Sequence, residues 1–538
     1  MSASSRSLIR HGSALSLLTL CSRILGLFRE MTKASLLGTS ALSDAFSVAF
    51  MIPNLFRRLF AEGSVTVAFI PVFKDYLLKD AFSVPDTQKV PDTQKVPNTE
   101  IRDFLSCIFT FLTFFVTLAV IAGILVTPAV VSFFGMEAFD ETVFLTRLMF
   151  PFLGFISIAA FFQGILNGVR VFAPSGFAPI LLNLVTILCA YALSPFTANP
   201  ARAMAAGILI GGFLEAAVQF PFVLKKGFRF FFTGLKRAIK HPGTRTVLRL
   251  VGPTIIGMAA YQLNDLVSTA LAGNAGEGVV SSLQYSLRLQ ELILGIFAVS
   301  IGTVILPDLS EYAKSSQWER YNDSLISAMN IIALITIPIT FFSLSQGETL
   351  IRLLFQSRSF NETSVVLTLS AFTFHMPGLF FIALNRILAP AFYAQSDSKS
   401  PTLAGIVSFV VNMGLAALLA GPLKGAGIAL ALTLASAVNT ALLLIFLRRN
   451  LRIALNKALR STLIYSVKLI LFSCIAAVPV IALSPRLLSL FSGRRRIIGY
   501  GLPLAINAAI FAAAGIALLV MSGDKHIRAI RNMLRKKA

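Results

Sequence analysis

Charged residues are scarce in this chain of 538 residues: Asp, Glu, Lys and Arg together make up 13% of it, against 56% for hydrophobic residues. The mean hydropathy is +0.79. Soluble domains carry roughly a quarter charged residues, because their surface must be solvated. The scarcity therefore excludes an ordinary soluble domain and indicates a chain that lies mostly in lipid.

Cysteine and histidine are also scarce, with four of each. The cysteines lie far apart, so their spacing predicts neither a disulfide framework nor a zinc site. The histidines are scattered, and the chain has no HExxH, GxSxG or P-loop motif and no grouped carboxylates that could hold a catalytic metal. These absences argue against an enzyme, and the sequence predicts no resident cofactor.

Long hydrophobic runs are what the chain does have. Because about 20 apolar residues span a bilayer, we predict an all-α integral membrane protein with about fourteen transmembrane helices. The expected ranges are 13–38, 44–78, 103–135, 143–170, 175–196, 202–224, 246–272, 279–312, 322–345, 362–393, 401–421, 424–447, 463–483 and 498–521. The first run holds Arg23 and Glu30 and lacks a small-residue cleavage site, so we expect a retained helix and not a removed signal peptide.

The net charge of +23 is concentrated in connecting segments. In a soluble protein it would suggest nucleic acid, but here it fits membrane orientation and contact with anionic phospholipid. The strongest basic segments, 225–249 and 448–460, are predicted to be cytoplasmic, and counting helices from them places both termini on the same side. The loop 484–497, with four arginines, falls on the opposite side and does not fit this topology.

Two repeats organise the chain. Residues 84–100 read VPDTQK, VPDTQK, VPNTE, so we predict a disordered cytoplasmic loop over 80–101. The segment IPVFKDY at 70–76 returns as LPDLSEY at 306–312, 236 residues later, as in a duplicated transporter. We therefore predict two six-helix lobes around a central cationic cavity. The predicted parts are a first lobe over 1–225, a basic cytoplasmic linker over 226–245, a second lobe over 246–447, and two further helices with a basic tail over 448–538.

Ionisable residues inside the predicted helices mark the functional region, because each costs about 2.5–3.5 kcal/mol to insert. They lie in the first, second and eighth helices: Arg23, Arg29, Glu30, Lys33, Asp44, Arg57, Arg58, Glu62, Arg288, Glu291 and Asp308. The excess of arginine favours an anionic cargo such as a phosphate or pyrophosphate, which a guanidinium binds through two hydrogen bonds. Alternatively, individual arginines reach the interface or pair with Glu30 or Glu62 only to be neutralised.

Oxygen-bearing side chains in later helices suggest a second type of site. Asp265, Asn412 and Thr433 offer ligands for a sodium ion or a proton relay. For the polar side chains other than Asp265, hydrogen bonding between helices is an equally open interpretation.

Several motifs resemble the MurJ (MviN) lipid II flippase family, within the multidrug/oligosaccharidyl-lipid/polysaccharide exporter superfamily. They span nearly the whole chain: SRILGLFR at 22–29, SDAFSVAF at 43–50, PNLFRRLFAEG at 53–63, AFIP at 68–71, YSLRLQE at 285–291, GTVILP at 302–307, LAPAFY at 388–393 and GPLKGAG at 421–427. The tandem repeat at 84–100 departs from the family pattern.

The resemblance implies a protein of the bacterial inner membrane that flips undecaprenyl-linked lipid II by alternating access for peptidoglycan synthesis. It implies substrate binding by Arg23, Arg29, Arg57 and Arg288. It also implies that Asp44 and Glu62 gate or brace the lobes, and we predict the same role for their neighbours Arg58 and Glu291. The last two helices would form a groove for the polyprenyl tail. Membrane potential or Na⁺ would drive transport, and cell-wall synthesis enzymes are possible partners. Two alternatives stay open: a carrier of another polyprenyl-linked saccharide, and a non-transporting cell-wall scaffold.

Overall fold

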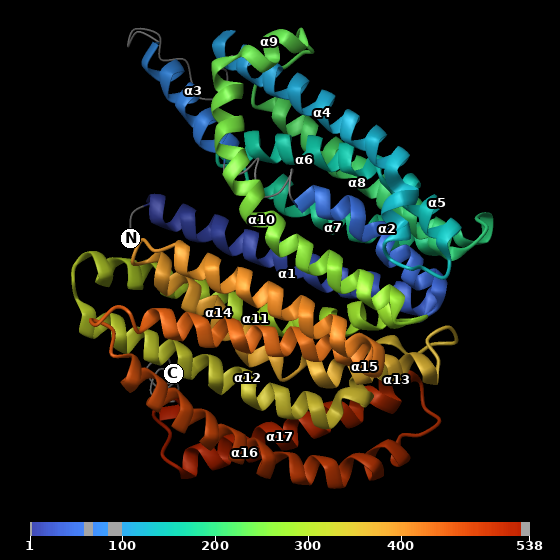
Figure 1. The fold of residues 1–538 in the computed structure, drawn as a ribbon, viewed down its shortest axis with the longest axis vertical. Coiled ribbons are helices and arrows are strands. Elements are labelled where there is room, and N and C mark those ends of the chain that lie inside the picture. The colour runs from blue at the N-terminus through green and yellow to red at the C-terminus, as the bar shows by residue number, and fades with distance from the viewer. Residues whose placement is uncertain (1–2, 59–67, 84–98, 529–538) are drawn as a thin grey trace. The chain divides into compact units, whose positions relative to one another are not determined.

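The computed structural model describes residues 3–58, 68–83 and 99–528, and in this part of the chain every regular element is helical. The chain divides into two compact units, residues 1–280 and 281–538. Figure 1 shows the helices of each unit with their labels. The all-α membrane fold predicted from the sequence is confirmed.

Unit 1 contains ten α-helices and one 3₁₀-helical turn (Ser194–Phe196) within its described residues. The α-helices are α1 (Ala3–Leu37), α2 (Ala41–Arg57), α3 (Ile70–Ser83), α4 (Thr99–Ser132), α5 (Phe139–Met149), α6 (Pro151–Gly168), α7 (Ala173–Ala192), α8 (Pro200–Lys225), α9 (Leu235–Lys240) and α10 (Pro242–Asn274). Helices α7 and α8 pack closely, and α6 lies against α8 (Figure 1). The core between α3, α4 and α6 is rich in phenylalanine, with Phe69, Phe104 and Phe161 fully buried and in ring contact.

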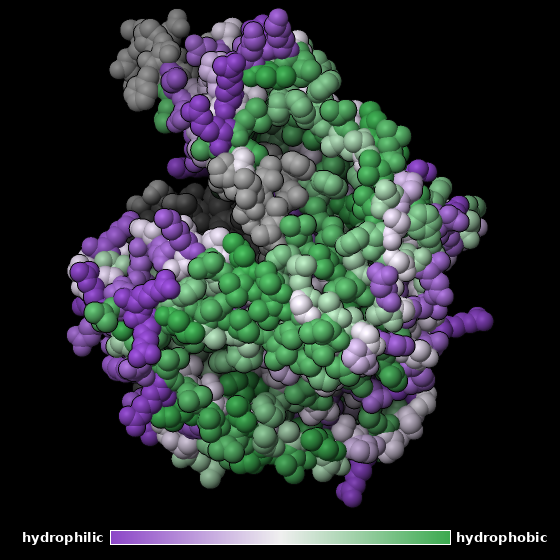
Figure 2. All heavy atoms as spheres, viewed as in Figure 1, coloured by the Kyte–Doolittle hydropathy of each residue, from purple (hydrophilic) through white to green (hydrophobic). Residues whose placement is uncertain are grey.

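Unit 2 is formed by the C-terminal helices. They are α11 (Val279–Lys314), α12 (Trp318–Phe355), α13 (Glu362–His375), α14 (Gly378–Tyr393), α15 (Lys399–Leu447), α16 (Leu455–Leu490), a π-helical turn (Ile497–Gly501) and α17 (Leu502–Met521). Buried residues of α16 and α17 pack against α12 in two apolar clusters. Figure 2 shows hydrophobic side chains over most of the visible surface of this unit, with hydrophilic ones where its helices begin and end.

Eight helices of the described chain are long and apolar enough to cross a membrane, or nine if the bent pair α13 and α14 forms one span. The count of fourteen is consistent with these helices but stays a prediction. Two expected helices, 401–421 and 424–447, form α15, which breaks at Lys424 with φ 47° and ψ −129°. The expected helix 362–393 is instead two helices meeting at 45°, because Pro377 between them cannot donate a backbone hydrogen bond.

Other predicted bounds need correction. The expected loop over 80–101 is narrower, since α3 continues to Ser83 and α4 begins at Thr99; its repeat at 84–98 lies outside the described residues. The loop expected at 484–497 is shorter, because α16 extends to Leu490. The two compact units meet at residue 280, and the division into repeat-related lobes with a basic linker over 226–245 stays a prediction.

The linker 226–245 is packed and not a free connection. Phe228 is 4% exposed and belongs to the core of unit 1. The backbone N–H of Phe231 donates to Ser106 Oγ at 3.1 Å, and that of Thr233 donates to Thr110 Oγ1 at 2.9 Å. These bonds attach the extended linker to α4, so Phe228 is buried in the core of unit 1 while the lysines and arginines of the linker stay at the surface.

The crossing of α7 and α8 yields a test of this packing. A Cβ added at Gly207 would lie 2.9 Å from the backbone of Thr186, whereas one at Gly154 would meet nothing within 4 Å. We expect Gly207→Val to destabilise the protein by about 1–3 kcal/mol through overpacking, read as a lower melting temperature in detergent. Gly154→Val is the matched control, and equal melting temperatures for the two variants would contradict the close crossing.

Candidate functional site

The turn between α1 and α2 positions the first group of predicted site residues. Gly38 takes φ +59°, a conformation that favours glycine, and Ser40 then caps α2 by accepting a hydrogen bond from the Ser43 N–H at 3.3 Å. Asp44 follows in the first turn of α2, where a carboxylate is stabilised by the helix dipole. The turn thus brings the end of α1 against the start of α2.

Asp44 is only 3% exposed and joins α2 to the turn that follows α10. Its Oδ2 accepts a hydrogen bond from the Gly278 N–H at 2.7 Å. Beside it, the Ala41 N–H donates to Glu277 Oε1 at 2.8 Å. These two bonds hold distant parts of unit 1 together, and the gating or bracing of the lobes predicted for Asp44 stays a prediction.

A network of four side chains lies deeper along α1 and α2. Glu30 is shared by two cations, with Oε1 3.1 Å from Arg29 Nη2 and Oε2 3.8 Å from Lys33 Nζ. Lys33, 2% exposed, also donates to Ser47 Oγ at 2.7 Å. Asp44 also interacts electrostatically with Lys33, so Glu30 and Asp44 together face the two cations of this group.

Arg29 is oriented by an aromatic ring as well as by Glu30. Its Cζ lies 5.3 Å from the centroid of the Phe50 ring on α2. The guanidinium side chain is 16% exposed, so it is largely desolvated. A desolvated cation interacts more strongly with an anion than one in bulk water, which makes this network the strongest anion-binding candidate in unit 1.

The remaining predicted residues of unit 1 are placed as follows. Arg23 is half-buried on α1 and makes no ion pair within the described residues. Arg57 donates from Nε to Asn54 Oδ1 at 2.7 Å, one turn after Pro53, and Arg58 follows it at the C-cap of α2. Glu62 lies outside the described residues.

Arg288 belongs to unit 2 and lies on α11. Its Nη1 is 3.4 Å from Glu291 Oε2, in a pair that is partly exposed to solvent. Ser286, two residues before Arg288, and Gln290, two residues after it, are both buried. Since residues two apart in a helix point about 200° from each other, Arg288 is directed away from the face that these two polar side chains occupy.

Ser286 and Gln290 contact the break between α13 and α14, which the sequence did not single out. Ser286 Oγ is 2.7 Å from His375 Nδ1, and Gln290 Nε2 donates to the His375 carbonyl. Thr433 Oγ1 donates to the Phe374 carbonyl at 2.7 Å, and Thr340 Oγ1 to that of Met376 at 3.3 Å. Three consecutive carbonyls before Pro377 are thus satisfied by side chains from α11, α15 and α12.

The predicted sodium ligands are not brought together within one unit. Asp265 lies on α10 of unit 1, whereas Asn412 and Thr433 lie on α15 of unit 2. Asn412 is 2% exposed, and the Thr433 hydroxyl donates to a carbonyl, as the hydrogen-bonding alternative expects. A sodium site formed by these residues stays a prediction.

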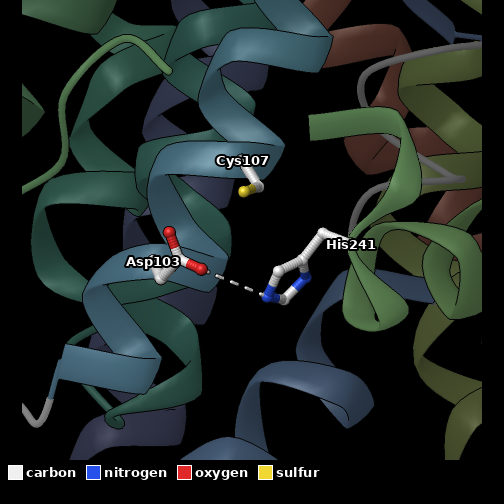
Figure 3. A group of neighbouring side chains, drawn as sticks. All are labelled: Asp103, Cys107 and His241. Atoms are coloured by element: carbon white, nitrogen blue, oxygen red, sulfur yellow. Dashed lines mark ion pairs between the residues drawn. The ribbon is translucent and has the colours of Figure 1, made fainter. Parts of the chain in front are cut away.

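One further cluster has donor atoms of the kind that bind zinc. Asp103 and Cys107, one turn apart on α4, and His241 before α10 offer ligand atoms within 4.8 Å of one another (Figure 3). However, the Gly243 N–H donates to His241 Nδ1 at 3.2 Å, which places the ring proton on Nε2. Arg237 binds Asp103 at 2.8 Å. The protonated Nε2 faces Asp103, so the arrangement is better suited to fixing the linker on α4 than to holding a metal.

Two kinds of evidence place this geometry in a known context. A family model described as lipid II flippase MurJ matches residues 33–496. The chain is 47% identical over 533 residues to "Probable lipid II flippase MurJ" of Treponema pallidum, covering 98% of this chain and 99% of that protein. It is 33% identical over 439 residues to "Lipid II flippase MurJ" of Burkholderia cenocepacia, covering 80% and 82% of the two chains.

Solved structures agree on the fold. One titled "Lipid II flippase MurJ, inward closed conformation" gives a TM-score of 0.74 at 22% identity, covering 95% of this chain and 99% of that chain. An inward-facing multidrug resistance MATE family transporter of the MOP superfamily gives 0.63 at 14% identity, covering 81% and 96%. At such identities the likeness concerns the fold alone, and it is the transporter fold that the sequence predicted.

The bracing bond of Asp44 gives a stability test. We expect Asp44→Ala to lower the free energy of unfolding by about 1–3 kcal/mol, because the Gly278 N–H loses a charged acceptor. Thermal unfolding of the purified protein in detergent measures this effect. Glu277→Ala, which removes an exposed acceptor, should cost clearly less, and an equal loss would argue against Asp44 as the brace.

The linker contact gives a pH test. Burial lowers the pKa of His241 below its usual 6.5, and Arg237 lowers it further, while Asp103 raises it. The folded protein therefore takes up this proton at lower pH than the unfolded chain, and stability contributed by neutral His241 is lost as the pH falls below 6.5. We expect the melting temperature to decrease less between pH 7.5 and 5.5 in His241→Asn, whose amide can still cap α10. An unchanged pH dependence would contradict this role.

Proposed function

The chain belongs to the lipid II flippase MurJ family, and we propose that it carries lipid II from the cytoplasmic to the outer leaflet of a bacterial inner membrane by alternating access. Both termini would lie in the cytoplasm. The cationic group of α1 and α2 supports an anionic cargo, and the pyrophosphate of lipid II is such a group. The sugar-peptide headgroup would cross through the protein while the polyprenyl tail stays in lipid.

The observation that carries the proposal is the largely buried guanidinium of Arg29, which is held by Glu30 and by the Phe50 ring. A guanidinium has five N–H donors in a planar fork, so Arg29 can bind a phosphate oxygen while it stays in contact with Glu30. A cationic or purely apolar cargo would gain nothing from this guanidinium.

Within this mechanism the predicted arginines have different roles. Arg29 is held against Phe50 and Glu30, so it is preorganised for a phosphate oxygen. Arg57 is oriented by Asn54 and lies one turn after Pro53, which removes a backbone donor from α2. Arg288, directed away from the buried side of α11, would also bind an anion. Membrane potential would return the empty carrier, since its cationic group responds to the field.

The proposal is tested by single substitutions of Arg29, Arg57 and Arg288 with Ala. Each should reduce lipid II translocation about tenfold or more, because a lost charged hydrogen bond is worth about 1.5–3 kcal/mol. The readout is cleavage of lipid II by an externally added colicin in cells depleted of the native protein, with membrane abundance checked.

Arg320→Ala is the matched control, because Arg320 is exposed and bonds only Gln317 at 2.9 Å among the described residues. Normal translocation by all three arginine variants would contradict the arginine mechanism. Cleavage that persists when the protein itself is absent would instead indicate another polyprenyl-linked cargo or a scaffold.

A further inference from the structure

A pocket of about 530 Å³ lies at one end of unit 2, beside the connection from α15 to α16. Polar side chains from three segments line it, together with the apolar ends of α14 and α15. The lining residues that matter are Gln395, Asp397, Phe446, Arg449, Asn450 and Arg452. None of them belongs to the cationic group of α1 and α2.

The pocket has two guanidinium groups without a carboxylate partner among the described residues. Arg449 Cζ lies 4.7 Å from the ring centroid of Phe446, and Arg452 Cζ lies 5.4 Å from that of Trp318. Stacking on a ring occupies the face of a guanidinium and leaves its N–H edge available for an acceptor. Two such edges beside one pocket suit the oxygens of a phosphate ester.

Asp397 does not cancel this charge, because its carboxylate is used to cap α15. Its Oδ1 accepts hydrogen bonds from the backbone of Lys399 and Ser400 at 2.9 and 3.0 Å, and its Oδ2 accepts one from Ser400 Oγ at 2.6 Å. An aspartate bound by three donors at a helix N-terminus has little capacity left to compete for the arginines.

The loop that carries the arginines is held in place before any ligand arrives. Asn450 Nδ2 donates to Gln395 Oε1 at 2.7 Å, and its own Oδ1 accepts from the Arg452 N–H at 3.1 Å. Asn322 on α12 donates to the Arg452 carbonyl at 3.1 Å and accepts from the Ala454 N–H at 3.0 Å. A loop fixed in this way loses little entropy when it binds an anion.

Apolar side chains next to the arginines point to a ligand with a lipid tail. Leu451, between Asn450 and Arg452, is 96% exposed, and Ile445, one turn before Arg449, is 59% exposed. Cations next to exposed apolar side chains at a helix end are typical of the membrane interface. If these arginines served only to orient the chain in the membrane, their positive charge would be enough. Neither the pocket nor the hydrogen-bonded loop would then be needed.

We propose that this pocket binds the phosphodiester headgroup of an anionic phospholipid, with the acyl chains along the exposed apolar surface of α15. The pocket would anchor the start of α16 to the leaflet that the charge pattern predicts to be cytoplasmic. The same guanidinium groups could receive a soluble phosphate ester, so the two sources must be separated by experiment.

The single tryptophan of the chain, Trp318, is a built-in reporter because Arg452 stacks on it. We would titrate the full-length protein in detergent with short-chain phosphatidylglycerol and record tryptophan emission. A saturable change is expected, with at least about fivefold weaker apparent affinity in Arg449→Gln, which loses one of two charged contacts. Arg449 does not stack on Trp318, so this variant keeps the reporter intact.

Arg448→Gln is the matched control, since Arg448 adjoins the pocket without lining it, and it should bind like the unchanged protein. The unchanged protein is also titrated with phosphatidylcholine and, separately, with glycerol phosphate. An equal response to phosphatidylcholine would overturn selection for an anionic lipid, and an equal response to glycerol phosphate would show a soluble anion as the ligand. No response, or identical affinities for Arg449→Gln and Arg448→Gln, would overturn the site.

Discussion

The cost of placing charge at membrane depth governs this structure. Each ionisable group inside a helix must find a partner or contact with water, and Glu30 provides one carboxylate for both Arg29 and Lys33. Asp44 is a second acid that interacts with Lys33. The group is therefore stabilised without a ligand, and the proposed pyrophosphate would compete with Glu30 for Arg29.

The backbone is subject to the same constraint. At the junction of α13 and α14, the bend leaves carbonyls that no water in lipid could satisfy, and Thr433, Gln290 and Thr340 donate to them. Because Gln290 is committed to this junction, α11 has a defined rotation, and Arg288 is directed to the opposite side. The bent helix thus contributes to the site by fixing the orientation of a helix that carries a predicted ligand.

Much of this could be predicted from the sequence. Long apolar runs gave the all-α membrane fold, and the motifs around Arg23, Arg57 and Arg288 identified the family, which the comparisons confirm. The charged residues of α1 predict an anion site there, and this stays a prediction. These features are local, since hydropathy and motif spacing are written along the chain.

What the sequence did not reveal depends on contacts between distant residues. The charge of Lys33 is evident from the sequence, but its bond to Ser47 requires the fold of α1 against α2. His375 is one of four histidines scattered along the sequence, and only the fold shows that it lies buried beside Ser286. The lysines and arginines of the basic linker do not indicate that Phe228 belongs to a core.

The most direct test of the central claim is the equilibrium affinity of the detergent-solubilised protein for lipid II in Glu30→Gln compared with Arg29→Ala. Glutamine keeps a hydrogen-bond acceptor for Arg29 but removes the negative charge that balances Arg29 and Lys33. If these cations bind the pyrophosphate, Glu30→Gln should bind lipid II several-fold more tightly and Arg29→Ala more weakly. Weaker or unchanged binding in Glu30→Gln would contradict the account.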